Sequence, residues 1–445
     1  MSQEWLWMSA AELGRGIGQG EIDPLRLAET YLEAIEGHEL SLNIYARVTH
    51  ERAISEANAA SKRAATGLRF GLLDGVPISW KDLFDSAGIG TEAGSAHLKG
   101  RVPERDAEVL ENATKAGLVC LGKTHMSELA FSGLGYNPIT ATPPCVNDAE
   151  AVPGGSSSGA AASVAFGLAA AAIGSDTGGS VRIPAAWNDL VGLKTTHGLL
   201  SLKGVVPLCE SFDTVGPLCR SVEDAALLLA ALGGTAAADL TAANLVGRRF
   251  LVLENVAMEN LRAQPEQGFR RAIAAITKAG AVVQHGQIAE VSEAMTLTGC
   301  LYTVDAYAQW QDVIEAAPHL MYDQILQRFR AGAAYSGVEY VQSWMRLRQL
   351  RAGYLAKTAG YDAVLVPSSP IMPPNLVRLK AEHDYYVEEN LLALRNTRIG
   401  NLMGLAALSL PTGIPSTGIT LLGAPMSEAR LLRLGVVLES LLATN

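Results

Sequence analysis

Histidine is scarce in this chain of 445 residues, and its scarcity limits the chemistry that can be expected. Only eight histidines are present, and none lies in the serine-rich segment between residues 153 and 184. The later histidines stand in no catalytic motif; they are His197, His285, His319 and His383. No histidine or cysteine spacing is typical of a zinc site, so we expect neither a metal nor a cofactor.

Cysteine and clustered positive charge are scarce as well. The five cysteines are scattered without a Cys-x-x-Cys pair, which argues against a disulfide framework. The formal net charge is −10, and no run of lysine and arginine indicates a phosphate-binding surface. Nucleic acid is therefore not expected as the main partner.

Long hydrophobic runs are also missing. The longest apolar stretches, around residues 164–173 and 225–232, are far shorter than the ~20 residues that span a bilayer. The first residues, MSQEWLWMSAAEL, have neither a basic start nor a sustained apolar segment, so no signal peptide is expected. These features predict a cytoplasmic protein with no membrane partner.

Strand and helix patterns alternate along the chain. A capping box at Ser9–Glu12 and the pair Asp23-Pro24 mark the first two helices, and the second ends at Gly37. Strands are expected at 42–48, 118–121, 249–253, 281–284, 363–367, 406–410 and 419–422, and helices at 107–115, 267–278 and 427–442. The alternation predicts an α/β fold, with a mixed, mostly parallel sheet flanked by helices.

We expect one large domain over residues 1–445, because no long linker or repeat interrupts the pattern. Within it, N-terminal helices are expected over about 1–65 and a core over about 66–235. Residues of about 287–360 are expected to form a variable helical region that faces substrate. A plain amphipathic layer explains that region equally well.

The serine-rich segment consists of two Gly/Ser turns around an apolar stretch. Residues 160–173 are almost wholly apolar, unlike a flexible linker, and no phosphate-loop motif follows a strand here. Gly155–Gly159 fits the G-x-S-x-G pattern of a nucleophile elbow, but loop-like residues precede it where that motif needs a strand. Neither reading explains the segment.

The second turn, Gly174–Ser180, suggests another chemistry. Successive N–H groups in a glycine-rich turn can converge on an anion, and a serine at its end would lie beside them. Such a serine needs a base, and burial lowers the pKa of a lysine toward neutrality. Lys81, at the end of the apolar segment GVPISWKD, is a candidate. An ordinary edge lysine paired with Asp82 is an equally good explanation of that residue alone.

Taken together, these segments resemble the amidase signature family of serine hydrolases. The matching segments are GVPISWKD (75–82), PGGSSSGAAA (153–162), GSDTGGSVRIPAA (174–186) and GLKTTHGLLS (192–201). The similarity continues through 221–232, 361–370 and 400–413, and so covers nearly the whole chain. The resemblance implies a Ser–Ser–Lys triad, in which Ser180 is the nucleophile, Ser156 the bridging serine and Lys81 the base.

The resemblance also implies roles around this triad. The peptide bond entering Ser156 should be cis, and Ser157 should help to hold the lysine. Asp176 and Arg182 should brace the loop as an ion pair, although Arg182 could instead face a substrate carboxylate. The oxyanion hole should consist of backbone N–H groups of Thr177, Gly178, Gly179 and Ser180.

The function implied is that of an amidase without a cofactor, which releases an acid and ammonia or an amine from a small-molecule amide. A homodimer is an assembly that the resemblance allows. Two alternatives stay open. Residues 187–189 and 197–199 depart from the usual pattern, and Asn188 together with the segment 198–207 faintly resembles allophanate and biuret-type hydrolases. The other alternative is a glutaminase component like the A subunit of glutamyl-tRNA amidotransferase, which belongs to the same family.

Overall fold

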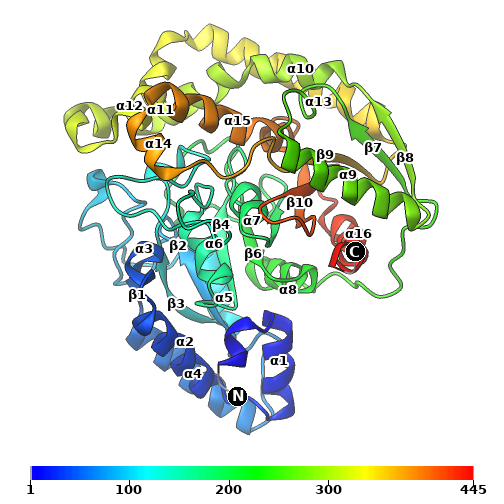
Figure 1. Ribbon diagram of the computed structural model, residues 1–445. Coiled ribbons are helices and arrows are strands. Elements are labelled where there is room, and N and C mark those ends of the chain that lie inside the picture. Colours follow the sequence, from blue (N-terminus) through cyan, green and yellow to red (C-terminus); the bar gives the residue numbers. More distant parts are fainter. Residues whose placement is uncertain (1–2, 444–445) are drawn as a thin grey trace.

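The computed structural model describes residues 3–443, and one sheet of eleven strands runs through them (Figure 1). The strand order is β1-β3-β2-β4-β6-β5-β10-β11-β9-β7-β8. The strands are β1 (Tyr45–Val48), β2 (Pro77–Lys81), β3 (Val119–Thr124), β4 (Ala171–Ser175), β5 (Val191–Lys194), β6 (Val215–Cys219), β7 (Arg249–Leu253), β8 (Val282–Gly286), β9 (Ala363–Pro367), β10 (Ala406–Pro411) and β11 (Gly418–Gly423).

The sheet is mixed, as the sequence predicts, but parallel pairs do not predominate. The pairs β2–β3, β2–β4, β7–β8 and β7–β9 are parallel, and the other six neighbouring pairs are antiparallel. The short segment 412–417 joins β10 to β11, which is too short for the crossover that a parallel pair needs. The expected alternation of strand and helix breaks down in this part of the chain.

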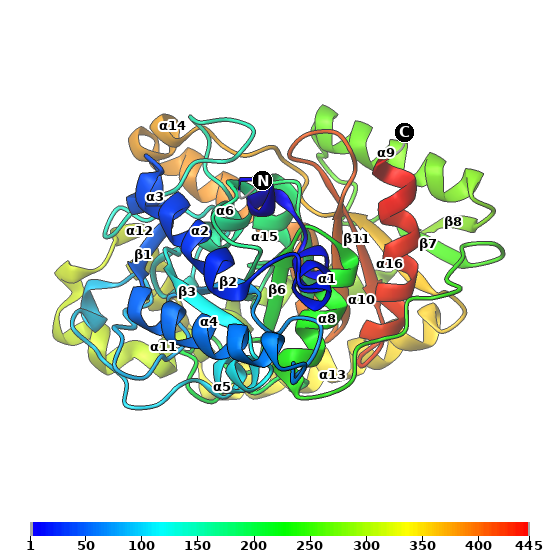
Figure 2. The same cartoon turned by 90° about the horizontal axis from the view of Figure 1, so that it is seen from below.

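Helices cover the sheet. They are α1 (Ala10–Gln19), α2 (Pro24–Gly37), α3 (Ser41–Ile44), α4 (His50–Ala65), α5 (Glu108–Lys115), α6 (Ser158–Ala165), α7 (Arg182–Trp187), α8 (Val222–Gly233), α9 (Ala263–Lys278), α10 (Ala289–Thr296), α11 (Thr298–Ala316), α12 (Asp323–Arg330), α13 (Gly337–Thr358), α14 (Leu376–Ala381), α15 (His383–Leu402) and α16 (Glu428–Ala443). Figure 2 shows α1, α2, α4, α8 and α16 on one side, and Figure 1 shows α10–α13 and α15 on the opposite side. Within residues 3–443, no helix combines the length and the apolar character that crossing a membrane requires.

Most predicted elements are confirmed within a few residues, and the strand expected at 42–48 is the clearest exception. Residues Ser41–Ile44 form the short helix α3, and the strand begins only at Tyr45. Leu42 is 84% exposed, so the apolar alternation at its start does not mark a buried face. The capping box of α1 and the Asp23 cap of α2 are confirmed.

Strand β2 has one charged side chain, that of Lys81, and this side chain is buried in the interior. All five residues of PISWK are buried, and Trp80 packs edge-on against Phe84 at 5.3 Å between ring centroids. A strand buried on both faces normally consists of apolar residues. The packing of its neighbours therefore holds Lys81 in a buried position, where a charged lysine lowers the stability of the fold.

Candidate active site

The ends of β2 and β4 bring the lysine and serine segments together. The two strands are parallel neighbours, with Trp80 opposite Ile173, so Lys81 and Ser175 end them at the same edge of the sheet. Ser156 lies just before helix α6, which packs against both strands. This edge, at the carboxyl ends of parallel strands, is where α/β folds commonly place their active sites.

Lys81 is fully buried and contacts two hydroxyl groups. Its Nζ donates a hydrogen bond to Ser156 Oγ at 2.6 Å and another to Ser175 Oγ at 2.8 Å. Burial lowers the pKa of Lys81 to about 7, although the charges of Asp213 and Asp176 act in the opposite direction. A lysine with this pKa is partly neutral at physiological pH and can accept a proton.

The alternative explanation of Lys81 as an edge lysine paired with Asp82 is wrong. Asp82 instead lies 3.4 Å from the Nζ of Lys123 and 3.6 Å from a guanidinium nitrogen of Arg47. Asp82 follows the last residue of β2, and among the described residues it forms no ion pair or hydrogen bond with Lys81. Among the described residues, Lys81 Nζ hydrogen-bonds only to the hydroxyls of Ser156 and Ser175.

The expected role of Ser157 at the lysine is taken by Ser175. The Ser157 hydroxyl donates to the backbone carbonyl of Ser175 at 3.3 Å and makes no hydrogen bond to Lys81 in the described structure. The Ser157 N–H donates to the carbonyl of Ser180 at 3.2 Å. Ser157 therefore joins the two Gly/Ser turns to each other. The Gly155–Ser156 peptide bond is cis, as the family resemblance implies.

Ser180 lines a cavity, and its hydroxyl has no hydrogen-bond partner in the described structure. The residue is 3% exposed and lines the cavity together with Thr177 and Gly178. Within residues 3–443, its Oγ takes part in no hydrogen bond, and the N–H groups of Thr177, Gly178 and Ser180 have no protein acceptor. These three N–H groups are available to an oxyanion.

The Gly179 N–H, which we also expected in the oxyanion hole, is already occupied. It donates to Asp176 Oδ1 at 2.8 Å. Gly179 has φ of +139°, a conformation that favours glycine and turns its N–H toward the carboxylate. Asp176 therefore shapes the turn, and its neighbours in sequence provide the free donors.

A methyl group at position 179 should disrupt this turn. The added Cβ would lie 2.1 Å from Thr397 Oγ1, whereas at Gly178 it would lie 3.6 Å from the nearest atom, a methyl of Leu394. Since one oxyanion donor contributes about 10²–10³-fold to kcat, we expect Gly179→Ala to lose at least about 10²-fold in activity. Gly178→Ala should lose clearly less. Amide turnover by the two purified variants tests this, and equal losses would contradict it.

Asp176 and Arg182 form a buried ion pair beneath the turn. Arg182 donates from Nε at 3.0 Å and from Nη2 at 2.9 Å to the two carboxylate oxygens, and neither side chain is exposed. Its remaining donors reach the Thr397 carbonyl and Asn401 Oδ1 at 2.7 and 2.6 Å. Burial disfavours the ionised carboxylate, but the charge and hydrogen bonds of Arg182 lower the pKa of Asp176 to about 2. Arg182 thus braces the loop: four of its five N–H groups bond to the protein, its side chain is fully buried, and it does not line the cavity beside Ser180.

Removal of Arg182 should destabilise the protein strongly. Arg182→Met leaves the Asp176 charge buried without its partner, which typically costs about 3–5 kcal/mol of the free energy of unfolding. Arg15→Met, which breaks the exposed pair with Glu223, is the matched control and should cost about 0–1 kcal/mol. Urea unfolding of both variants measures the difference. A loss at position 182 no larger than the loss at position 15 would show that the pair does not brace the loop.

The cavity beyond Ser180 has a volume of about 200 Å³. Helices α11 and α12 supply Tyr302 and Arg328, and helix α15 supplies Leu394 and Arg398. Part of the helical region at 287–360 therefore faces this cavity. The division of the chain into an N-terminal, a core and a variable region otherwise stays a prediction.

Comparison with known proteins identifies the family. The model of the Amidase family matches residues 26–432. The chain belongs to the amidase family. A curated relative, 2-amino-5-chloromuconic acid deaminase of Comamonas testosteroni, is 32% identical over 446 residues, which cover 98% of this chain and 96% of the relative. The A subunit of glutamyl-tRNA(Gln) amidotransferase of Anaeromyxobacter sp. (strain K) is 33% identical over 480 residues, which cover 98% of this chain and 97% of that relative.

A solved structure supports the same assignment. A crystal structure described as an amidase superposes with a TM-score of 0.86 at 29% sequence identity, over 97% of this chain and 99% of that one. Members of the amidase family hydrolyse amide C–N bonds, and the fold and sequence of this chain are those of such an enzyme.

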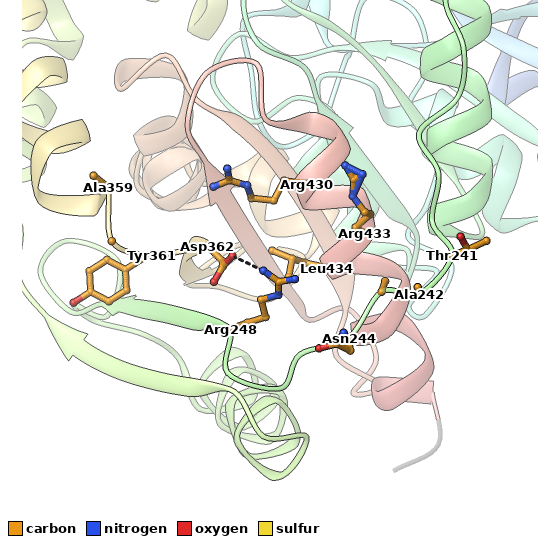
Figure 3. A pocket seen from close by; sticks show the side chains of 12 residues that line it. Thr241, Ala242, Asn244, Arg248, Ala359, Tyr361, Asp362, Arg430, Arg433 and Leu434 are labelled. Atoms are coloured by element: carbon orange, nitrogen blue, oxygen red, sulfur yellow. Dashed lines mark hydrogen bonds and ion pairs between the residues drawn. The ribbon is translucent and has the colours of Figure 1, made fainter.

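A second hollow in this amidase-family chain has no catalytic groups. Its volume is about 410 Å³, and it lies where α16 approaches the end of α13 (Figure 3). Figure 3 shows Arg430 and Arg433 around it, and Arg248 paired with Asp362 at 3.4 Å. None of the triad residues lines this hollow. Among the described residues, no group of three or more His, Cys, Asp or Glu side chains is arranged to hold a metal ion.

Sequence reasoning missed three groups at the site. Ser175 lies inside a recognised motif, but its contact with the lysine depends on strand pairing. Asp213 accepts hydrogen bonds from the Thr177 hydroxyl and from the N–H groups of Leu208 and Cys209, and no motif marks it. The third group is the pair of arginines in the cavity, Arg328 and Arg398, which lie outside every matching segment.

Proposed function

We propose that this chain hydrolyses a small-molecule amide through an acyl-enzyme on Ser180, with Lys81 and Ser156 carrying the proton. The observation that carries this proposal is the 2.6 Å hydrogen bond from Lys81 Nζ to Ser156 Oγ. Among residues 3–443, no histidine side chain hydrogen-bonds to Lys81, Ser156 or Ser180. The free hydroxyl of Ser180 lies at the adjoining turn. A lysine with a pKa of about 7 can act where a histidine usually does.

The mechanism has two halves. In the first, neutral Lys81 accepts the proton of Ser156, and Ser156 accepts that of Ser180 as Ser180 Oγ attacks the amide carbonyl. The N–H groups of Thr177, Gly178 and Ser180 stabilise the negative oxygen of the tetrahedral intermediate. Ser156 then gives a proton to the leaving nitrogen, and the C–N bond breaks. In the second half, water attacks the ester on Ser180 along the same proton path and releases the acid.

Two observations support a small-molecule substrate. The cavity is smaller than the roughly 300–1,000 Å³ that is typical of pockets for drug-sized ligands, so a compact amide fits best. The deaminase relative, named for 2-amino-5-chloromuconic acid, aligns over 446 residues, close to the length of this chain. The alignment with the amidotransferase relative covers the same share of this chain but extends over 480 positions, because that relative is longer. The length of the alignment therefore favours the small-molecule enzyme.

The ureido-hydrolase alternative gains no support from the residues that suggested it. Asn188 uses its amide to hold the loop, donating to the carbonyls of Pro153 and Pro184 at 2.7 and 2.8 Å. The His197 ring lies 2.9 Å from the Glu210 carbonyl. Neither residue lines the cavity beyond Ser180.

Ammonia release from a panel of primary amides by the purified chain tests the proposal. We expect turnover of at least one small amide without any added protein. Glutaminase activity that arises only when a tRNA-binding partner is added would favour the amidotransferase function instead. No release from any amide, together with no acylation of Ser180, would contradict the proposal. Light scattering on the same preparation distinguishes a homodimer from a monomer. The cytoplasmic location of the protein stays a prediction.

A further inference from the structure

Two arginines line the cavity beside Ser180, and neither has an acidic partner in the part of the chain that the structure describes. Arg328 lies near the end of α12 and Arg398 near the end of α15. Within residues 3–443, neither guanidinium forms a salt bridge or donates a hydrogen bond to another residue. Among the described residues, no aspartate or glutamate lines the cavity. The cavity therefore holds two positive charges that the described protein does not neutralise.

Aromatic rings hold these guanidinium groups in place. The central carbon of the Arg328 guanidinium lies 4.5 Å from the centre of the Phe131 ring, and that of Arg398 lies 5.9 Å from the centre of the Tyr302 ring. Burial and the neighbouring charge of Arg398 lower the pKa of Arg328 to about 10, and burial also lowers the pKa of Arg398. The pKa of Arg328 keeps it charged at neutral pH. Stacking on a ring orients a guanidinium while leaving its N–H groups free.

Buried donors in the same cavity are left without acceptors. Arg328 Nη1 and the Tyr302 hydroxyl are both buried and have no hydrogen-bond partner in the described part of the chain. Tyr302 as a whole is 7% exposed. Native proteins pair nearly all of their buried polar groups, so unpaired donors that share a cavity call for an acceptor from outside the chain.

We propose that Arg328, Arg398 and the Tyr302 hydroxyl bind a carboxylate of the substrate. This inference rests on the proposed function and makes the substrate an amide that also carries a free carboxylate. Arginine is suited to this task because its planar fork can bind both oxygens of a carboxylate. The rest of the lining is mostly apolar, so charge recognition is concentrated at this one place.

The substrate that fits is short. A Cβ atom at Gly178 would lie 3.9 Å from Arg398 Nε, so this guanidinium borders the turn that supplies the oxyanion donors. The carboxylate and the scissile carbonyl must then be separated by only a few carbon atoms, in a cavity of about 200 Å³. A monoamide of a small dicarboxylic acid has this form.

Binding of dicarboxylates tests the inference without any need for turnover. Succinate, glutarate and adipate, each compared with its neutral diamide, are titrated into the full chain by calorimetry. We expect at least one dicarboxylate to bind at least tenfold more tightly than its diamide. Arg328→Met and Arg398→Met should each raise that Kd at least tenfold. Arg330→Met is the matched control. Arg330 lies on α12, as Arg328 does, but it does not line the cavity and instead forms an exposed ion pair with Glu315. Its replacement should change Kd less than twofold.

Tyr302→Phe removes one hydroxyl and keeps the ring, so it tests the site even where an arginine variant misfolds. We expect it to weaken dicarboxylate binding by at least threefold. Failure of every dicarboxylate to bind more tightly than its diamide would overturn the inference. Unchanged affinity in folded Arg328→Met and Arg398→Met would also overturn it.

Kinetics separates this inference from the proposed function. Glutaramate, which carries a carboxylate, is compared with the neutral pentanamide. We expect the two arginine variants to lower kcat/KM for glutaramate at least tenfold and to leave pentanamide within twofold. Equal losses on both amides would mean that the arginines act on the reacting carbonyl, which overturns the inference and leaves amide hydrolysis intact. Dicarboxylate binding with no hydrolysis of any amide would support the inference and contradict the function.

Discussion

Ser180→Ala should lower amide turnover by at least about 10³-fold, because this substitution removes the nucleophile and the remaining groups cannot form the ester. The fold should be kept. Within the described structure the Ser180 hydroxyl makes no hydrogen bond, so its removal leaves no buried partner unpaired. Ammonia release measures the activity, and circular dichroism with thermal unfolding measures the fold.

Ser163→Ala is the matched control for this loss. Ser163 is a buried serine of the same segment, and its hydroxyl bonds to the Ala160 carbonyl and to Ser79 Oγ, both at 2.8 Å. It does not line the cavity. We expect it to change stability more than turnover. If Ser180→Ala kept near-normal turnover on every accepted amide, Ser180 would not be the nucleophile.

The pH dependence should follow the protonation of Lys81. Since only the neutral amine can accept a proton and its pKa is about 7, kcat/KM should rise as pH increases through 7 and level off above it. Lys81→Met should lose at least about 10³-fold, because an activated nucleophile depends on its adjacent base. The measurement is a profile of kcat/KM from pH 5 to 9.

Lys194 offers a control for the effect of burial alone. Its pKa is also lowered to about 7 by burial, but its Nζ donates to the carbonyls of Thr195 and Leu405 rather than to a serine. Lys194→Met should lower stability and keep the inflection near pH 7. A flat profile in the unmodified chain would contradict the assignment of Lys81, and so would an inflection that survives in a still active Lys81→Met.

The sequence was most informative where local patterns determine structure. The strands at 249–253 and 363–367 have the bounds that their apolar runs predict, and the caps of α1 and α2 follow from a few adjacent residues. The segment motifs indicated that Lys81 and Ser156 belong together, and the structure places them in contact. Their catalytic roles stay predictions.

The errors arose where tertiary contacts decide. The sequence indicated Ser157 as the serine beside Lys81, whereas the parallel pairing of β2 with β4 places Ser175 there. The direction of the Gly179 N–H depends on a φ of +139°, which the motif does not reveal. Arg328 and Arg398 are separated by strand β9 and by the α-helices α13 and α14, and only the packing of α12 and α15 around the cavity brings them together.

Trapping the acyl-enzyme shows which side chain attacks the amide. The purified chain is mixed with an accepted amide, quenched in acid within its first turnovers, digested, and the modified residue is located by mass spectrometry. We expect a mass increase that corresponds to the acyl group on Ser180, and none in Ser180→Ala. An adduct on Ser156, Ser157 or Lys81, or turnover of the amide by Ser180→Ala at the normal rate, would contradict the assignment of Ser180 as the nucleophile.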